Sequence, residues 1–462
     1  MNALITEAPS NSPVIPIHVL SESQLTRWLT GAPPHQAQWI EQHGFKGKAG
    51  QLVVLPDEDG QVAAAICGHD EKKDIIWTLA HLPARLPKGI YSLSTETRER
   101  FSEDQQALLY MGFGLACYRF DRYKTQTQPK AQLLIPETLG EEFMALLDAS
   151  FWARDIVNTP ANDMGPQELS DLAEQLASDH GASFKVIDGL ALEESFPAIH
   201  IVGHASTRAP RLITMKWGRA GAPTLALVGK GVVFDTGGLS IKPSSGMLLM
   251  KKDLGGAAHV LALAKVIMQL GLDVDLRVYI PAVENAIAGN AYRPSDIIQT
   301  RKGTRVEIGN TDAEGRVVLA DALTLAAEEG AERIIDFATL TGAARVALGE
   351  DLPPIYGRDL NGVRAIQDLS FELSDPLWPM PLFDGYREMI QPPHADLSNS
   401  GSSPMAGSIT AALFLDHFVP EGIDWYHLDI YAWNVGDRPG RPIGGEAQGI
   451  RAMWAWLKAT YG

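Results

Sequence analysis

The chain has 462 residues, of which 45% are hydrophobic and 21% are charged, and its formal net charge is −17. These fractions are typical of soluble globular proteins and argue against a disordered, fibrous or membrane-embedded chain. The acidic balance repels polyanions and disfavours nucleic acid as a partner. Because single hydrophobic cores stop growing near ~250 to 300 residues, two domains are expected.

Three features predict a cytoplasmic location. The N-terminal stretch has no basic region, and Pro13 and Pro16 break its apolar part, so we expect no signal peptide. No run of roughly 18 unbroken apolar residues predicts a membrane helix. Cys67 and Cys117 are the only cysteines, and their settings indicate neither a disulfide framework nor a zinc knuckle.

The first part of the chain, residues 1–135, mixes β-rich runs at 51–56 and 61–68 with helical stretches. It holds no cluster of catalytic residue types, so we predict an accessory N-terminal α/β domain. Residues 136–158 carry apolar side chains at helical spacing, ahead of Pro160. They predict a linking helix between two domains.

The remainder, residues 159–462, alternates apolar strands with amphipathic helices. Three helices are predicted after Pro166, around 257–264 and around 319–326, and each is followed by a glycine. The predicted strands are 224–235, 274–285, 305–308 and 333–340. This alternation predicts a mostly parallel or mixed sheet flanked by helices, with functional residues at the carboxyl ends of its strands.

Four carboxylates and a lysine lie where such functional residues are expected: Lys230, Asp235, Asp253, Asp312 and Glu314. Taken singly, Asp253 or Asp312 could simply cap a helix. Taken together, converging carboxylates repel one another and need a compensating cation. Oxygen ligands without thiolates or an obvious histidine set favour Mg, Mn or zinc in a site of two ions.

Other catalytic motifs find little support. The glycine-rich segment 229–243 could be read as a phosphate loop, but its lysine is not followed by Ser or Thr. The glycines of 111–117 stop short of a dinucleotide fingerprint and favour helix packing. There is no HExxH and no GxSxG motif, so zincin and serine acyl-enzyme chemistry have no visible basis.

Several motifs in order resemble the leucyl aminopeptidase family. NTDAEGR at 310–316 is similar to the family signature, and MKKDLGGAA at 250–258 with the segment 229–243 is similar to its other metal-binding block. YRPSD at 292–296 and DFATLTGA at 336–343 also match in order and spacing. The resemblance covers about residues 150–462. It implies a catalytic α/β domain with a zinc-exopeptidase-like α/β/α sandwich and a mixed sheet.

The resemblance also implies a metal-binding role for each of the five residues. Asp235 and Glu314 would bridge two divalent ions, Lys230 and Asp253 would complete one site, and Asp312 the other. Mn or Zn is expected, with Mg or Co as alternatives. A lysine ligand must be neutral, against a usual pKa of about 10.4, and two nearby dications favour that form.

The implied reaction is release of N-terminal amino acids by water that the two ions activate. Lys242 would stabilise the oxyanion, and Arg316 would hold a bicarbonate ion that acts as general base. Without the surrounding motifs, both side chains would be read as solvated surface charges. The residues expected around the substrate are Met250, Thr339, Leu340 and Gly342.

The family pattern further implies a homohexamer that acts on short peptides with a free N-terminus. Tyr431 departs from that pattern, because a small alanine is common at its position, so we expect a narrowed or reshaped pocket for the N-terminal side chain. A DNA-binding regulator on the same scaffold is the alternative function. The acidic net charge argues against it.

Overall fold

The computed structural model describes residues 3–10 and 12–462. Contacts divide the chain into two compact units. The first comprises Met1–Leu147 and Val435–Ile443, and the second comprises Asp148–Asn434 and Gly444–Gly462. The sequence did not indicate that Val435–Ile443 would join the first unit. The predicted domain boundaries, after residues 135 and 158, stay predictions.

The first unit is built on a six-stranded sheet with strand order β1-β6-β5-β2-β4-β3. Both β-rich runs predicted in this part are confirmed, as β3 and β4. One part of its core joins the sheet to the first two helices through Leu20, Leu25, Ile40 and Leu55. The elements are β1 Leu4–Ile5, β2 Val14–Leu20, α1 Glu22–Gly31, α2 Pro34–Gln42, β3 Leu52–Pro56, β4 Val62–Gly68, β5 Gly89–Leu93, α3 Thr95–Arg100, α4 Glu103–Ala116 and β6 Ala131–Leu134.

The second unit is built on a nine-stranded mixed sheet with strand order β16-β15-β18-β14-β9-β11-β8-β7, and β10 pairs with β11. Its long strands are β7 Ser183–Asp188, β8 Arg211–Gly218, β9 Thr224–Gly229, β10 Gly231–Asp235, β11 Asp275–Asn285, β14 Arg333–Ala338 and β18 Asp424–Asp429. The short strands are β12 Ile297–Gln299, β13 Arg305–Glu307, β15 Pro354–Gly357, β16 Trp378–Pro379, β17 Leu397–Ser398, β19 Trp433–Asn434 and β20 Gly444–Gly445.

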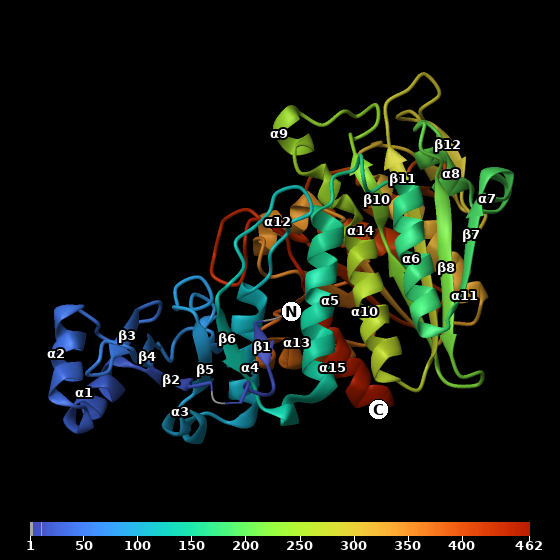
Figure 1. The fold of residues 1–462 in the computed structure, drawn as a ribbon. Coiled ribbons are helices and arrows are strands. Elements are labelled where there is room, and N and C mark those ends of the chain that lie inside the picture. Colours follow the sequence, from blue (N-terminus) through green and yellow to red (C-terminus); the bar gives the residue numbers. More distant parts are fainter. Residues whose placement is uncertain (1–2, 11) are drawn as a thin grey trace. The chain divides into compact units, whose positions relative to one another are not determined.

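Helices flank this sheet, as the sequence predicted (Figure 1). They are α6 Pro166–His180, α7 Gly189–Ser195, α8 Pro197–Gly203, α9 Ser244–Met247, α10 Gly255–Leu270, α11 Glu314–Glu328, α12 Gly342–Leu348, α13 Leu360–Glu372, α14 Gly407–Asp416 and α15 Ile450–Tyr461. Helix α5, Gly140–Asn158, lies within the range predicted for a linking helix, and the division between the two units falls inside it, after Leu147.

The sheet is buried on both faces. Ala226 and Val228 of β9 pack into one core cluster with α8, α11 and α14, while Leu225 and Leu227 point to the opposite face. Helix α10 packs against β9 and β14. Four neighbouring strands of the sheet run parallel: β11, β9, β14 and β18. Their carboxyl ends therefore meet at one edge of the sheet.

The single strand predicted at 224–235 is wrong, because the chain leaves the sheet at Lys230. The backbone N–H of Lys230 donates to the carbonyl of Phe337 in β14, and the Lys230 carbonyl accepts from the N–H of Ala257 in α10. These contacts separate β9 from β10. They hold Lys230 between the sheet and α10.

One helical stretch, Met250–Leu270, is long and apolar enough to cross a membrane by length and composition. However, 83% of its apolar window is buried inside the protein. It therefore has the character of a core helix.

Candidate active site

The five predicted metal ligands come from segments that meet at the carboxyl edge of the large sheet. Lys230 follows β9, and Asp235 ends β10. Asp253 lies in a short 3-10 helix directly before α10, whereas Asp312 precedes α11 and Glu314 is its first residue. The topology thus brings together side chains that are up to 84 residues apart in sequence.

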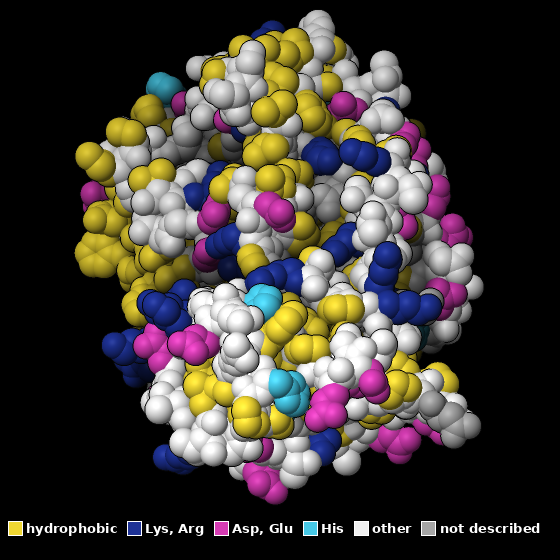
Figure 2. All heavy atoms as spheres, turned by 60° about the vertical axis from the view of Figure 1, so that its left-hand side comes forward, with side chains coloured by type: hydrophobic (Ala, Val, Ile, Leu, Met, Phe, Trp, Pro, Cys, Tyr) yellow, Lys and Arg dark blue, Asp and Glu magenta, His cyan; other side chains and the backbone are white. Residues whose placement is uncertain are grey.

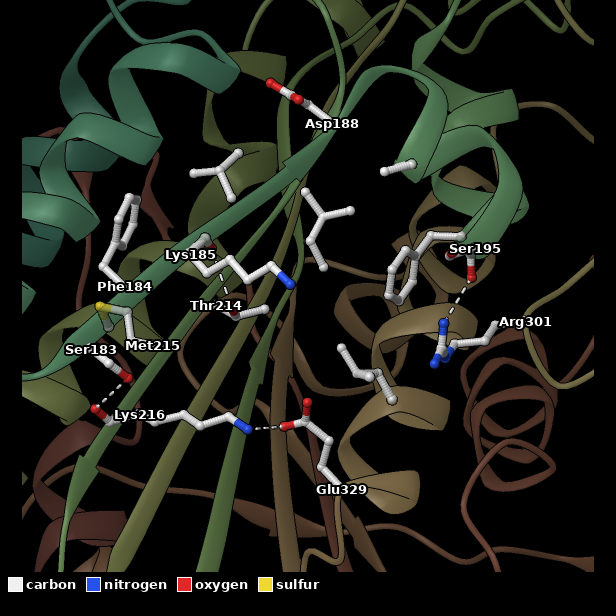
Figure 3. A pocket seen from close by; sticks show the side chains of 15 residues that line it. Ser183, Phe184, Lys185, Asp188, Ser195, Thr214, Met215, Lys216, Arg301 and Glu329 are labelled. Carbon is white, nitrogen blue, oxygen red and sulfur yellow. Dashed lines mark hydrogen bonds and ion pairs between the residues drawn. The ribbon is translucent and has the colours of Figure 1, made fainter.

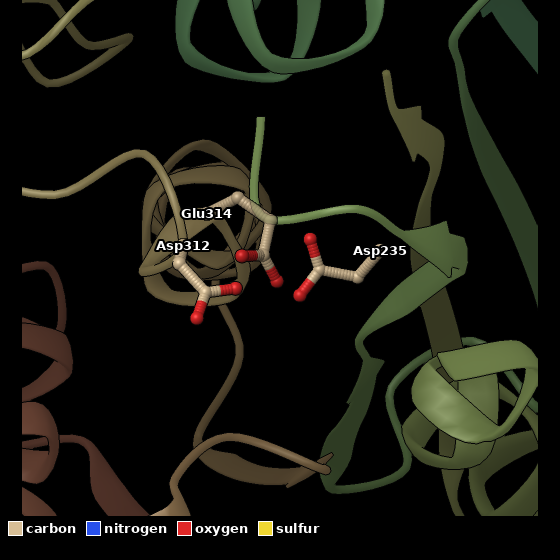
Figure 4. Close-up of side chains that lie close together, drawn as sticks. All are labelled: Asp235, Asp312 and Glu314. Carbon is tan, nitrogen blue, oxygen red and sulfur yellow. The ribbon is translucent and has the colours of Figure 1, made fainter. Parts of the chain in front are cut away.

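Three carboxylates lie close to one another. Asp235, Asp312 and Glu314 each offer an oxygen within 4.8 Å of the others (Figure 4). The Nζ atom of Lys230 lies 2.7 Å from Asp253 Oδ2 and 2.9 Å from Glu314 Oε1. All five residues therefore form one acidic cluster around a buried lysine.

Neighbouring donors hold these carboxylates in place. Asn285 Nδ2 and the N–H of Gly237 each donate to Asp235 Oδ1 at 2.8 Å. Thr339 Oγ1 donates to Asp253 Oδ1 at 2.8 Å. Such bonds fix one oxygen of each carboxylate, while the other oxygen faces a lysine, Lys242 for Asp235 and Lys230 for Asp253.

Burial and mutual repulsion raise the pKa values of two of the carboxyl groups. Burial and the charge of Asp235 raise the pKa of Glu314 to about 7, and burial and Asp253 raise the pKa of Asp235 to about 6. Burial lowers the pKa of Lys230, but the negative charges of Asp253 and Glu314 raise it by more, so the pKa lies above its usual value. In the absence of metal, Lys230 is therefore an ammonium ion.

The cluster has the chemistry of a divalent-cation site. Oε2 of Glu314 is buried and has no hydrogen-bond partner among the described residues. A carboxylate oxygen in that state is costly unless a cation satisfies it. Since the available ligands are carboxylate oxygens and one amine, they fit hard or borderline ions such as Mg, Mn and zinc.

Lys242 lies in the same cluster. Its Nζ atom lies 2.8 Å from Asp235 Oδ2 and also contacts Asp312 Oδ1. Burial lowers the pKa of Lys242, but Asp235 and Asp312 raise it above its usual value overall. It is therefore a fixed positive charge beside the acidic cluster rather than a solvated surface lysine.

Arg316 is a buried cation that has no ion-pair partner among the described residues. It is 8% exposed and forms no ion pair or hydrogen bond with a described residue, and its Nε atom is buried. Burial lowers its pKa to about 10, which still leaves the guanidinium protonated near neutral pH. A surface position is excluded, and a small anion would complete its surroundings.

The predicted substrate residues lie beside the cluster on two segments. Met250 begins the 3-10 helix that carries Asp253. Thr339 and Leu340 follow β14, and Gly342 begins α12. The Thr339 carbonyl accepts from Lys230 Nζ at 3.2 Å, and the Leu340 N–H donates to Asp429 at 2.9 Å.

Comparison with known proteins decides the family. A family model described as "Cytosol aminopeptidase family, catalytic domain" matches residues 151–454, and one described as "M17 aminopeptidase, N-terminal domain" matches residues 15–136. The chain belongs to the cytosol aminopeptidase family. It is an aminopeptidase-type hydrolase, the family is metal-dependent, and the predicted resemblance is confirmed.

Relatives of this aminopeptidase are similar to it in sequence and structure along most of the chain. A "Probable cytosol aminopeptidase" of Syntrophotalea carbinolica is 41% identical over 450 residues, which are 90% of each chain. The crystal structure of the cytosol aminopeptidase from Coxiella burnetii superposes with a TM-score of 0.96 at 45% identity over all of both chains. The bottromycin maturation enzyme BotP in complex with Mn gives 0.84 at 31% identity over 92% of this chain and 96% of BotP. The predicted fold class is confirmed.

Sequence reasoning missed two residues that surround Tyr431 in this aminopeptidase. Arg345 of α12 lies with its Cζ 4.8 Å from the centre of the Tyr431 ring, and Lys252 lies with its Nζ 4.9 Å from the same centre. Burial and the charge of Arg345 lower the pKa of Lys252 to about 7. The adjacency of Lys252 to Asp253 was the only available signal. We call Lys252, Arg345 and Tyr431 the tyrosine–cation cluster.

A separate cavity of about 600 Å³ opens on β7 and β8 (Figure 3). Lys185 reaches into it, and Lys216 pairs with Glu329 at 2.8 Å on its edge. None of the predicted site residues lines it. This cavity is therefore separate from the acidic cluster.

Proposed function

We propose that this aminopeptidase binds two divalent metal ions through the acidic cluster and uses them to hydrolyse the first peptide bond. Asp235 and Glu314 would contribute to both sites, Lys230 and Asp253 would complete one, and Asp312 would complete the other. The observation that carries the proposal is the buried Glu314 Oε2, which has no hydrogen-bond partner in the part of the chain that the structure describes. When bound, the ions supply Lewis acidity that activates water and polarises the peptide carbonyl.

The other residues have distinct roles in this proposal. Lys242 donates to the carbonyl oxygen as negative charge develops on it, because its ammonium group already lies against the acidic cluster. Arg316 would hold bicarbonate, which would supply a general base; the burial of Arg316 without an ion-pair partner among the described residues supports this role. The peptide lies along Met250, Thr339, Leu340 and Gly342.

We further propose Mn or Zn as the ions, with Mg or Co able to replace them, since BotP was solved in complex with Mn. The substrates are short peptides with a free N-terminus. A homohexamer and a cytoplasmic location remain part of the proposal.

A DNA-binding regulator remains the alternative, and the family match lends it no support. Figure 2 shows one face of the molecule, on which Asp and Glu side chains lie among Lys and Arg side chains. With a net charge of −17, such a face offers weak attraction for a polyanion.

Hydrolysis of amino-acid amides after chelation, and again after addition of Mn, Zn, Mg or Co, tests the metal proposal. Activity should disappear on chelation and return with at least one ion. Asp312→Ala and Lys242→Ala should each lower kcat/KM by about 100-fold or more. Asp273→Ala is the control, because this exposed aspartate precedes β11 at the opposite end of the strand. A protein freed of metal that kept full activity would refute the proposal.

A further inference from the structure

Two basic side chains share one aromatic ring at the edge of the active site. Tyr431 follows the carboxyl end of β18 and is half-buried. Arg345 approaches its ring from α12, and Lys252 approaches it from the segment that carries Asp253. Since like charges repel, such a pair is stable only where a ring or an anion offsets the repulsion.

No carboxylate of the described residues lies within ion-pair distance of either basic side chain. Among the described residues, neither Lys252 nor Arg345 forms an ion pair or a side-chain hydrogen bond, and Nη1 of Arg345 is buried without a partner. Lys252 is only 2% exposed. The nearby Asp429 is already engaged, because its two oxygens accept from Leu340 and Thr341.

The tyrosine–cation cluster borders open space at the proposed peptide-binding segment. A Cβ atom added to Gly342 would meet only Arg345 Nη2, at 3.7 Å. Gly342 is exposed, and Thr339 of the same loop donates to Asp253 in the acidic cluster. The Arg345 guanidinium therefore faces a space that a substrate side chain can enter, next to the metal centre.

We propose that the tyrosine–cation cluster selects peptides whose N-terminal residue is acidic. This inference rests on the proposed function. A side-chain carboxylate can accept two parallel hydrogen bonds from the Arg345 guanidinium, which the ring of Tyr431 holds in one plane. A basic N-terminal residue is repelled by the same charges.

The test compares kcat/KM for the dipeptides Glu-Leu, Gln-Leu, Lys-Leu and Leu-Leu on the metal-loaded enzyme. Glu and Gln have nearly the same shape, so their ratio isolates the charge. We expect Glu-Leu to exceed Gln-Leu by about tenfold, the effect of one charge-assisted interaction. Leu-Glu and Leu-Gln examine the second position, where we expect a ratio near one.

Variants of Arg345 separate recognition from structure. Arg345→Met should bring the Glu/Gln ratio close to one, and Arg345→Glu should reverse the preference so that Lys-Leu exceeds Glu-Leu. Loss of packing alone would not produce a reversal. Lys185→Met, in the separate cavity on β7, is the control and should keep the wild-type ratio.

The outcomes distinguish this inference from the proposed function. Hydrolysis of Leu-Leu and Gln-Leu with no preference for Glu-Leu would overturn the inference alone, and so would a preference found only at the second position. A wild-type ratio retained in Arg345→Met would also overturn it. Failure to hydrolyse any of the dipeptides with added metal would overturn both.

Discussion

Glu314→Gln should stabilise the metal-free protein while it abolishes stabilisation by metal. The carboxyl group of Glu314 is buried, and burial with the charge of Asp235 raises its pKa from 4.5 to about 7. A pKa raised in the folded state means that ionisation opposes folding, so the penalty is absent below pH 4.5 and grows until about pH 7. At about 1.4 kcal/mol per pH unit, the penalty reaches about 3 kcal/mol. Gln has the same shape and no charge.

Urea unfolding of chelator-treated protein at pH 5 and pH 8 measures this effect. The free energy of unfolding of Glu314→Gln should exceed that of the wild type by up to about 3 kcal/mol at pH 8 and by much less at pH 5. Added Mn should stabilise the wild type and leave the variant unchanged. Glu421→Gln, at an exposed glutamate, should behave as the wild type in every condition.

A variant no more stable than the wild type at pH 8 without metal would refute the reasoning. It would mean that the contact between Glu314 and Lys230, at 2.9 Å, outweighs the burial and repulsion that oppose ionisation. Equal stabilisation of variant and wild type by Mn would refute the placement of the ions at this carboxylate.

Two further substitutions examine packing and a buried ion pair. Gly256→Ala places a methyl group 2.1 Å from the Phe337 carbonyl oxygen, so it should lower the free energy of unfolding by about 1 to 3 kcal/mol. Gly289→Ala is the control, because its methyl group meets nothing within 4 Å and should leave the free energy of unfolding unchanged. Equal urea midpoints would contradict the packing argument. Arg154→Met removes a buried cation 2.8 Å from Glu446 and should lower the free energy of unfolding by about 3 to 5 kcal/mol in the same assay. A decrease of less than about 1 kcal/mol would contradict a stabilising role for this ion pair.

Much of the fold could be predicted because it depends on local patterns. Helices α6, α10 and α11 bury one apolar face or more and are followed closely by glycine, so periodicity and stop signals indicated them correctly. The break at Lys230 could not be predicted, since apolar residues continue on both sides. It depends on backbone bonds to Phe337 and Ala257, which are distant in sequence.

The same distinction applies to the site. The convergence of carboxylates was predictable, because the carboxyl ends of neighbouring parallel strands meet at one edge. The approach of Arg345 and Lys252 to Tyr431 was not, since these residues come from three separate segments and share no motif. Pairing across the fold must be seen in the structure before such a cluster can be found.

The acidic cluster also explains how metal and proton binding are linked. Four carboxylates face the two ammonium groups of Lys230 and Lys242, so the metal-free cluster is short of positive charge. Lys230 is held protonated by Asp253 and Glu314 in that state, yet it can bind a metal only as a neutral amine. If Lys230 is a ligand as proposed, loading releases its proton, and metal affinity should rise with pH until that proton is lost in the unloaded protein as well.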